Sequence, residues 1–295
     1  MNINTIPAKT IISTYTPCGW FGSNYNMNIY KGCCHGCIYC DSRSECYRIQ
    51  DFDVVRAKAN ALEIIEQDLL KKRKKGIVIT GAMSDPYNPY EAIYELTRGA
   101  LKLISRYGFG ICIDTKSDMV VRDIDLLIKI NRYSPVIVNF TITTADDNLC
   151  KKIEQNVCLT SERIEAIKKL TAEGIKCGIL LMPVLPFIND TKDNIQSIVQ
   201  MGYEAGVSWI YAGDGFGVTL RQNQREYYYE KLDELFPGTK LIYINRYGDS
   251  YICGVPDYSL FEFFLSECAY YNIANNMDDI IREILPPVME QISFF

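Results

Sequence analysis

The sequence lacks the features that mark membrane, secreted or nucleic-acid-binding chains. Its longest apolar runs, such as residues 178–183, are far shorter than the roughly 18 residues that a membrane span requires. Residues 1–10 contain no apolar segment of the kind found in signal peptides. The chain has 31 Lys and Arg against 36 Asp and Glu, a net charge of −5, so its composition does not predict the basic stripe of a nucleic-acid binder.

Cysteine, by contrast, is abundant, with 12 residues in a chain of 295. Without a secretion signal, this number of thiols is typical of a reducing compartment, and we expect a soluble, cytoplasmic protein. The length and the 48% hydrophobic composition are sufficient for a large core, compatible with one α/β barrel-like domain and an extension.

Three of these cysteines form a compact motif. Cys33, Cys37 and Cys40 have the spacing C-x3-C-x2-C, and the aromatic Tyr39 precedes the last of them. Thiolates are the usual ligands of [4Fe–4S] clusters, which normally take four. A set of three leaves one iron open, and an open iron can bind a small chelating ligand.

Two other interpretations of this motif are weaker. A structural zinc site closes with four ligands, often as two C-x2-C pairs. Cys34 and His35 could complete such a set, but both lie in the three-residue gap after Cys33, where a tetrahedral arrangement is awkward. A disulfide framework suits a small secreted chain, which this chain does not resemble.

Apolar runs alternate with amphipathic segments over the first two thirds of the chain. Buried strands that alternate with helices indicate a parallel sheet, and six such units predict a partial (β/α)6 barrel of the α/β class. The ends of strands that lead into helices carry the chemistry in such barrels. The expected strands are 24–30, 76–80, 110–115, 136–144, 176–182 and 208–212; the expected helices are 52–75, 91–106, 124–131, 161–173 and 192–205.

The alternation stops after about residue 220. We expect a helix at 225–235, a strand at 241–244 and a helix at 259–271. The sequence therefore predicts a core at 1–218, with an N-terminal lead-in strand, and a C-terminal α+β cap at 219–295 that packs on the barrel.

Several short segments, in order along almost the whole chain, are similar to those of a known family. They are Asn28–Cys33, His35–Cys40, Ser84–Glu91, Thr115–Ser117 with Arg122–Asp123, Ile153–Glu154, and Pro183–Pro186 with Asn189–Asp190. In these segments the chain resembles the radical S-adenosylmethionine (SAM) proteins of the spore photoproduct lyase-like family.

The resemblance implies a partial barrel with a C-terminal cap, a [4Fe–4S] cluster and SAM as cofactors, and lyase-like chemistry. SAM is cleaved reductively to methionine and a 5′-deoxyadenosyl radical, which abstracts hydrogen from a substrate. An electron donor such as flavodoxin or ferredoxin is implied as the partner. The resemblance assigns Cys33, Cys37 and Cys40 to the cluster and places Tyr39 against the adenine; alternatively, Tyr39 only packs the loop on the barrel.

The resemblance also assigns the remaining SAM contacts. Ser84 and Asp85, after the second strand, are the candidates for the methionine amino group. Lys116, after the third strand, is placed to pair with the methionine carboxylate, with Ser117 beside it. The alternative for Lys116 is a solvated loop lysine.

The fourth strand carries polar residues on one face. Asn139, Thr141 and Thr143 share that face because strand side chains alternate with a period of two, and we expect these three residues to line the cavity near the ribose. Thr is also an ordinary strand former, so packing alone is the alternative. His35, the only histidine, is expected to hydrogen-bond around the cluster loop rather than to act as a base.

The substrate is not predicted by these segments. Spore photoproduct lyase returns a hydrogen atom from a cysteine near the end of the second strand, whereas this sequence has Met83 there and no cysteine between Cys46 and Cys112. We therefore expect no repair of the thymine lesion. The predicted function is a radical SAM enzyme acting on a base, nucleotide, metabolite or protein residue; the alternatives are a DNA repair lyase and a non-catalytic iron–sulfur electron carrier.

Overall fold

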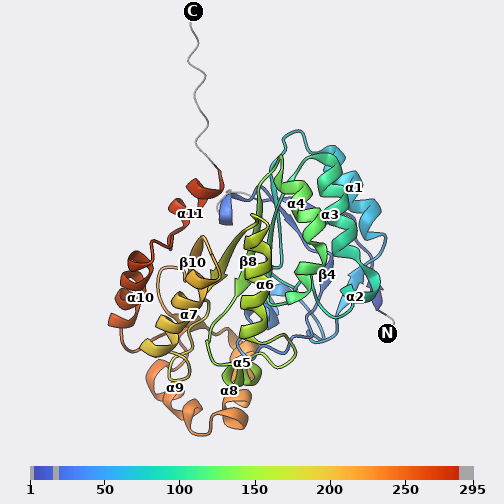
Figure 1. The fold of residues 1–295 in the computed structure, drawn as a ribbon. Coiled ribbons are helices and arrows are strands. Elements are labelled where there is room, and N and C mark those ends of the chain that lie inside the picture. Colours follow the sequence, from blue (N-terminus) through green and yellow to red (C-terminus); the bar gives the residue numbers. More distant parts are fainter. Residues whose placement is uncertain (1–2, 16–19, 286–295) are drawn as a thin grey trace, which may run out of the picture.

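A seven-stranded open sheet forms the centre of the molecule. The structure, a computed structural model, describes residues 3–15 and 20–285. The strands lie in the order β10-β9-β8-β7-β6-β3-β2; the first six in this order are parallel, and β2 pairs antiparallel with β3 at the edge. Their bounds are β2 Ile12–Thr14, β3 Tyr25–Met27, β6 Ile77–Thr80, β7 Gly110–Thr115, β8 Val136–Thr141, β9 Lys176–Leu180 and β10 Trp209–Tyr211. The six parallel strands confirm the predicted partial barrel (Figure 1).

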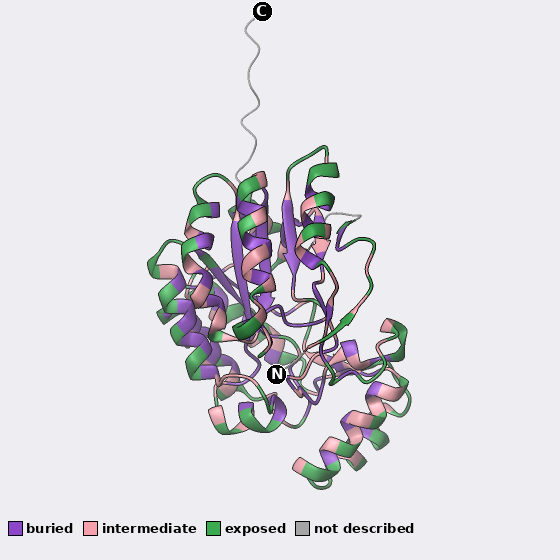
Figure 2. Ribbon diagram, turned by 90° about the vertical axis from the view of Figure 1, so that its right-hand side faces the viewer, coloured by how far each residue is buried: buried purple, intermediate pink, exposed green. Residues whose placement is uncertain are grey.

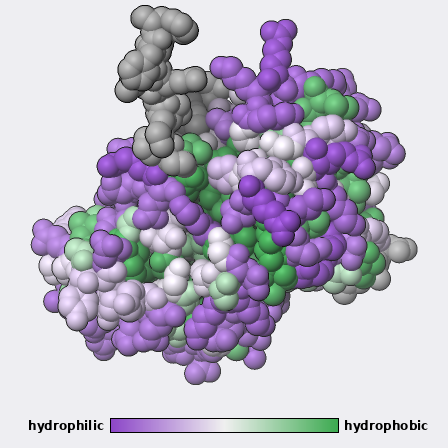
Figure 3. Space-filling model, turned by 45° about the horizontal axis from the view of Figure 1, so that its top comes forward, coloured by the Kyte–Doolittle hydropathy of each residue, from purple (hydrophilic) through white to green (hydrophobic). Residues whose placement is uncertain are grey.

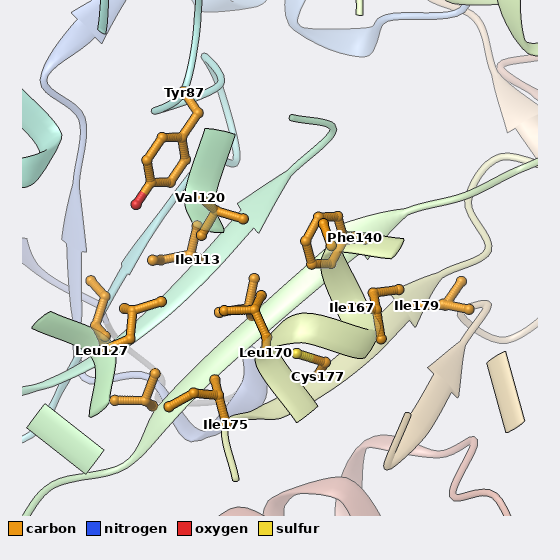
Figure 4. Packing of buried hydrophobic residues seen from close by; sticks show 14 of the residues in the cluster. Tyr87, Ile113, Val120, Leu127, Phe140, Ile167, Leu170, Ile175, Cys177 and Ile179 are labelled. Carbon is orange, nitrogen blue, oxygen red and sulfur yellow. The ribbon is translucent and has the colours of Figure 1, made fainter. Parts of the chain in front are cut away.

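Amphipathic helices cover the outer face of this sheet. They are α1 (Ala61–Lys71), α3 (Leu96–Tyr107), α4 (Ile124–Asn131), α6 (Thr160–Ala172) and α7 (Lys192–Glu204). Figure 2 shows buried strands behind helices whose outward faces are exposed. In Figure 4, Ile167 and Leu170 of α6 point toward Phe140 of β8 and Ile179 of β9, so alternate strand residues pack against the helices.

The other strand residues face the inside of the barrel. There Ile79, Ile137 and Trp209 form a second apolar cluster. It is completed by Phe21 of a 3-10 turn (η1, Trp20–Gly22) and by Ile280 of α11 (Met277–Ile284). These residues fill part of the concave side of the open sheet.

The structure corrects four expected elements. The strand expected at 24–30 is divided, because β3 belongs to the central sheet and residues 30–31 belong to a separate small sheet. The helix expected at 52–75 is shorter, because β5 (Arg56–Lys58) pairs with β1 (Asn4–Ile6) and β4 (Tyr30–Lys31) in a small sheet before α1 begins. The helix expected at 91–106 is divided into α2 (Glu91–Tyr94) and α3, because Glu95 has a left-handed φ of 47°. The strand expected at 241–244 is wrong, since these residues lie in α9 (Thr239–Tyr247). A short apolar run does not distinguish a strand from a helix.

The C-terminal region packs on several parts of the core. It contains β11 (Gly217–Thr219), α8 (Gln222–Leu235), α9, β12 (Ile252–Gly254), α10 (Ser259–Tyr270) and α11. In Figure 1, α8 and α9 lie at one end of the barrel beside α5 (Asp147–Ile153). Residues 286–295 of the predicted cap lie outside the described residues.

Apolar side chains are mostly enclosed by this arrangement. The face drawn in Figure 3 is largely hydrophilic, with hydrophobic residues in separate patches. No helix within the described part of the chain is long and apolar enough to span a membrane.

Candidate radical SAM site

The cysteine loop follows β4 and is held by the backbone of distant segments. The amide of Cys33 donates to the carbonyl of Phe52 (2.8 Å), and the amide of Ile38 donates to the carbonyl of Ile153 (3.0 Å). Gly32 has a φ of 83°, and a Cβ there would lie 2.4 Å from the carbonyl oxygen of Val54. Only glycine fits this approach without rearrangement, so the start of the loop is fixed by close packing.

The loop cysteines separate into two groups. Cys37 and Cys40 contribute to an apolar cluster shared with α8 and α9, whereas Cys34 packs against the main core. Burial raises the pKa of the Cys33 thiol to about 12 and raises the pKa of the Cys37 thiol well above its usual value. Loading this loop with iron therefore requires the release of protons.

The three cysteines on one loop are compatible with a [4Fe–4S] cube. Within residues 3–15 and 20–285, no three His, Cys, Asp or Glu side chains converge closely enough to hold one metal ion. A zinc site requires that convergence. In a [4Fe–4S] cluster each thiolate binds a different iron, so three spaced cysteines on one loop are compatible with it.

Behind the loop lies a buried charged pair. Glu154 and Arg163 of α6 are 2.6 Å apart, with 1% and 0% of their side chains exposed. The Tyr39 hydroxyl donates to Glu154, and Cys37 forms a backbone bridge with the same residue. Burial raises the pKa of Glu154, but Arg163 and Lys116 outweigh it and hold the net pKa below its usual value. The carboxylate is thus ionised and fixes the position of the Tyr39 ring.

Lys116 follows β7 and faces the same loop. Its ammonium lies 5.7 Å from the centre of the Tyr39 ring. Burial is the largest single influence and lowers the pKa of Lys116, but Cys37, Glu154 and Cys40 together outweigh it, so the net pKa is raised. Lys116 is therefore a cation suited to an anionic group.

Ser84 and Asp85 lie under the loop and are already hydrogen-bonded. The Ser84 hydroxyl donates to the carbonyl of Gly32 (2.6 Å). Asp85 accepts from the hydroxyl of Thr115 (2.8 Å) and from the amide of Lys116 (2.8 Å). One oxygen of Asp85 also lies 3.6 Å from Nδ1 of His35, so these residues connect the loop to the end of β7.

His35 has a supporting position in this network. It is buried, and burial lowers its pKa. The neutral imidazole ring lies beside Asp85. The backbone carbonyl of His35 accepts a hydrogen bond from the backbone amide of Asn156 (2.9 Å).

The remaining predicted residues have different surroundings. Ser117 is the N-cap of the 3-10 helix Asp118–Asp123 (η4) and accepts from the amide of Met119. The carbonyl of Thr141 accepts from Arg163 (2.8 Å). The hydroxyl of Thr143 is buried and has no hydrogen-bond partner among the described residues. Such an orphaned group is uncommon in a folded protein and is compatible with a bound ligand.

Asn139 lies deeper inside the barrel than expected for a ligand contact. It donates to Asp114 of β7 (2.8 Å) and accepts from the indole of Trp209 (2.9 Å). Asp114 also accepts from the indole of Trp20 (3.2 Å). Burial raises the pKa of Asp114 to about 6.

A cavity of about 1280 Å³ opens where these elements meet. Of the predicted site residues, it is lined by Tyr39, Cys40 and Lys116. The rest of the lining comprises Asp41, Ser42, Tyr47 and Ala82, together with residues that follow β9 and β10 and continue into the cap: Leu181–Val184, Ala212–Thr219, Arg246, Tyr247, Ile252, Gly254 and Tyr258. Pro183 and Val184 belong to a segment that carried the family resemblance, whereas the sequence did not indicate the cap residues. The glycine-rich segment 213–217 after the last expected strand is a further signal that could have suggested part of this lining.

A profile of the radical SAM superfamily matches residues 27–198, more than half of the chain. The chain belongs to the radical SAM superfamily. It is 35% identical to an uncharacterised protein of Methanocaldococcus jannaschii over 174 residues, covering 58% of this chain and 64% of that one. It is 26% identical to an uncharacterised protein of Mycobacterium tuberculosis over 234 residues, covering 77% and 67%.

The fold is also similar to that of a protein of known structure. Spore photoproduct lyase superposes with a TM-score of 0.65 at 14% identity, covering 92% of this chain and 79% of that one. At this identity the likeness concerns the fold alone, and it confirms the predicted architecture.

Proposed function

We propose that this radical SAM protein is an enzyme that uses a [4Fe–4S] cluster to cleave SAM reductively. The observation that supports this best is the cavity, because Cys40, Tyr39 and Lys116 line one side of it. A simple electron carrier requires no cavity of this size beside its cluster. When bound, the cluster would supply one electron to the sulfonium of SAM, giving methionine and a 5′-deoxyadenosyl radical.

The residues of the site have distinct roles in this proposal. Cys33, Cys37 and Cys40 would hold the cluster. The Lys116 ammonium would pair with the methionine carboxylate, which is a strong charge-assisted contact. The Tyr39 ring, fixed by its bond to Glu154, would support the adenine.

Other polar residues complete the proposed SAM site. Ser84 and Asp85 would approach the methionine amino group from below the loop, with Ser117 beside Lys116. Thr143 has an unsatisfied hydroxyl that would suit a ribose oxygen, and Thr141 belongs to the same strand end.

The rest of the cavity would hold the substrate. Segment 212–219 and the cap residues Arg246, Tyr247 and Tyr258 line this part. We propose that residues 1–218 carry the radical chemistry and that 219–295 form the cap that shapes the substrate space. Flavodoxin or ferredoxin is the proposed class of reductant.

One experiment tests the activity and the ligand assignment together. The protein, reconstituted with iron and sulfide without oxygen, is reduced and given SAM alone. We expect 5′-deoxyadenosine and one [4Fe–4S] cluster per chain; Cys33→Ala, Cys37→Ala and Cys40→Ala lose both, whereas the matched control Cys34→Ala retains both. Cluster reduction without SAM cleavage would favour the electron carrier instead, and loss of the cluster only in Cys34→Ala would refute the ligand set.

A further inference from the structure

A second hollow, of about 710 Å³, lies beside the cysteine loop. We call the cavity of about 1280 Å³ the SAM cavity; residues 41–48 separate it from the second hollow. Asp41 and Tyr47 of this segment line the SAM cavity, whereas Arg43 and Arg48 line the second hollow. The two hollows therefore approach the cysteine loop from different sides.

The charged lining of the second hollow is mostly cationic. It consists of Lys31, Arg43, Arg48 and Arg56 with one carboxylate, Glu45; we call it the basic pocket. This concentration of cations contrasts with the net charge of −5 of the chain. The basic pocket thus attracts anionic groups at one place on an acidic protein.

Two of these cations are already paired and two are not. Arg43 is 2.5 Å from Asp53, and Arg56 is 3.3 Å from Asp51. Lys31 and Arg48 have no ion pair among the residues that the structure describes. Lys31 and Arg48 are therefore available for an anionic partner.

The basic pocket is connected to the cluster cysteines through short contacts. The amide of Arg43 donates to the carbonyl of Cys40 (3.2 Å), and the carbonyl of Phe52 accepts from the amide of Cys33 (2.8 Å). The Arg43 guanidinium lies 4.8 Å from the centre of the Phe52 ring. Cys40 is therefore hydrogen-bonded directly to a residue that lines the basic pocket, and Cys33 is connected to the same residue through Phe52.

We propose that the basic pocket is the docking surface for an acidic one-electron carrier protein. The inference rests on the proposed function, in which the cluster must be reduced before SAM is cleaved. A reduced carrier would give one electron to the oxidised cluster and become oxidised by one electron itself. The rate of this transfer falls steeply with distance, so a carrier benefits from a site beside the cysteine loop and outside the SAM cavity.

Charge complementarity favours a carrier protein over a nucleic acid at this surface. Complementary charges raise association rates by steering the encounter. A nucleic-acid substrate would have to reach the radical in the SAM cavity, on the other side of residues 41–48. It would also meet a small cationic area rather than the long one that many phosphate contacts require.

The test measures the second-order rate constant of cluster reduction by reduced flavodoxin in a stopped-flow instrument. The variant is Lys31→Gln/Arg48→Gln. The matched control is Lys102→Gln/Arg132→Gln, which removes the same charge from exposed positions in and after the outer helices α3 and α4. At low ionic strength we expect the variant to react at least about fivefold more slowly, the control less than about twofold more slowly, and added salt to remove the difference.

Reduction by the methyl viologen radical cation separates this proposal from the proposed function. SAM cleavage with this small reductant should be equal in the wild type and the variant. If the wild type fails to cleave SAM, the proposed function is refuted, and the flavodoxin rate constants still decide the docking surface. Equal flavodoxin rates, or an equal decrease in the control, would overturn the docking proposal. So would loss of oligonucleotide binding in the variant at an unchanged flavodoxin rate, which would reassign the pocket to nucleic acid.

Discussion

Removal of the Arg163 charge should destabilise the protein far more than removal of a similar charge elsewhere on α6. Arg163 is fully buried and 2.6 Å from Glu154, and it donates to the carbonyls of Thr141 (2.8 Å) and Cys158 (2.7 Å). Arg163→Met leaves an ionised carboxylate without its partner inside the protein. Breaking a buried pair in this way costs about 3–5 kcal/mol, a large part of the stability of an ordinary domain.

The matched control is Lys168→Met on the same helix. Lys168 is also 2.6 Å from its partner, Glu165, but 46% and 61% of these two side chains are exposed. Exposed pairs contribute about 0–1 kcal/mol, and Met, Lys and Arg have similar helix propensities. The two substitutions therefore differ mainly in burial.

Urea unfolding of the anaerobic apoprotein, followed by circular dichroism, measures both effects. With an m-value of about 3 kcal/mol per M, Arg163→Met should lower the midpoint by about 1 M or more, and Lys168→Met by less than about 0.3 M. Adding Glu154→Gln to Arg163→Met removes the buried charge and should restore part of the loss. The reasoning fails if Arg163→Met costs no more than Lys168→Met.

Three further measurements test the site. Lys116→Met should leave the cluster spectrum unchanged but weaken SAM binding about tenfold or more, because a charge-assisted contact contributes roughly 1.5–3 kcal/mol; an unchanged dissociation constant in a titration would exclude Lys116 from the site. Burial raises the pKa of Asp114 to about 6 from 3.8, so the folded state keeps its proton to higher pH than the unfolded state, and this group lowers stability as pH rises through that interval. Asp114→Asn should therefore gain up to about 3 kcal/mol relative to the wild type between pH 4 and pH 7; parallel urea midpoints for the two proteins across this range would contradict it. Finally, the reduced protein with SAM should not restore thymine from the dinucleotide spore photoproduct. The loop after β6 has Met83 in place of a thiol, and Cys40, a proposed cluster ligand, is the only cysteine among the described residues that line the cavity. Multiple turnovers with near-stoichiometric thymine would refute this prediction.

The sequence by itself determined the barrel and the cysteine loop. Strands such as 110–115 and helices such as 124–131 agree with the structure, because their periodicity reflects which side chains are buried. The spacing of Cys33, Cys37 and Cys40 predicts a cluster site without any knowledge of the tertiary structure, since the three lie on one short loop. The predicted secondary structure was wrong where the pattern of apolar residues had no clear period, as at 241–244, where a strand was expected and a helix is present.

Only the tertiary structure showed which distant residues surround that loop. The bond from Tyr39 to Glu154 joins residues 115 positions apart, and the cavity includes Arg246 and Tyr258 of the cap. The basic pocket likewise combines the small sheet with residues 43–50 and Asn223. Local sequence patterns specify backbone conformation and a buried face, but they do not specify which elements meet. That pairing is decided by packing of the whole chain, and it determines the charges and the space around the proposed cluster.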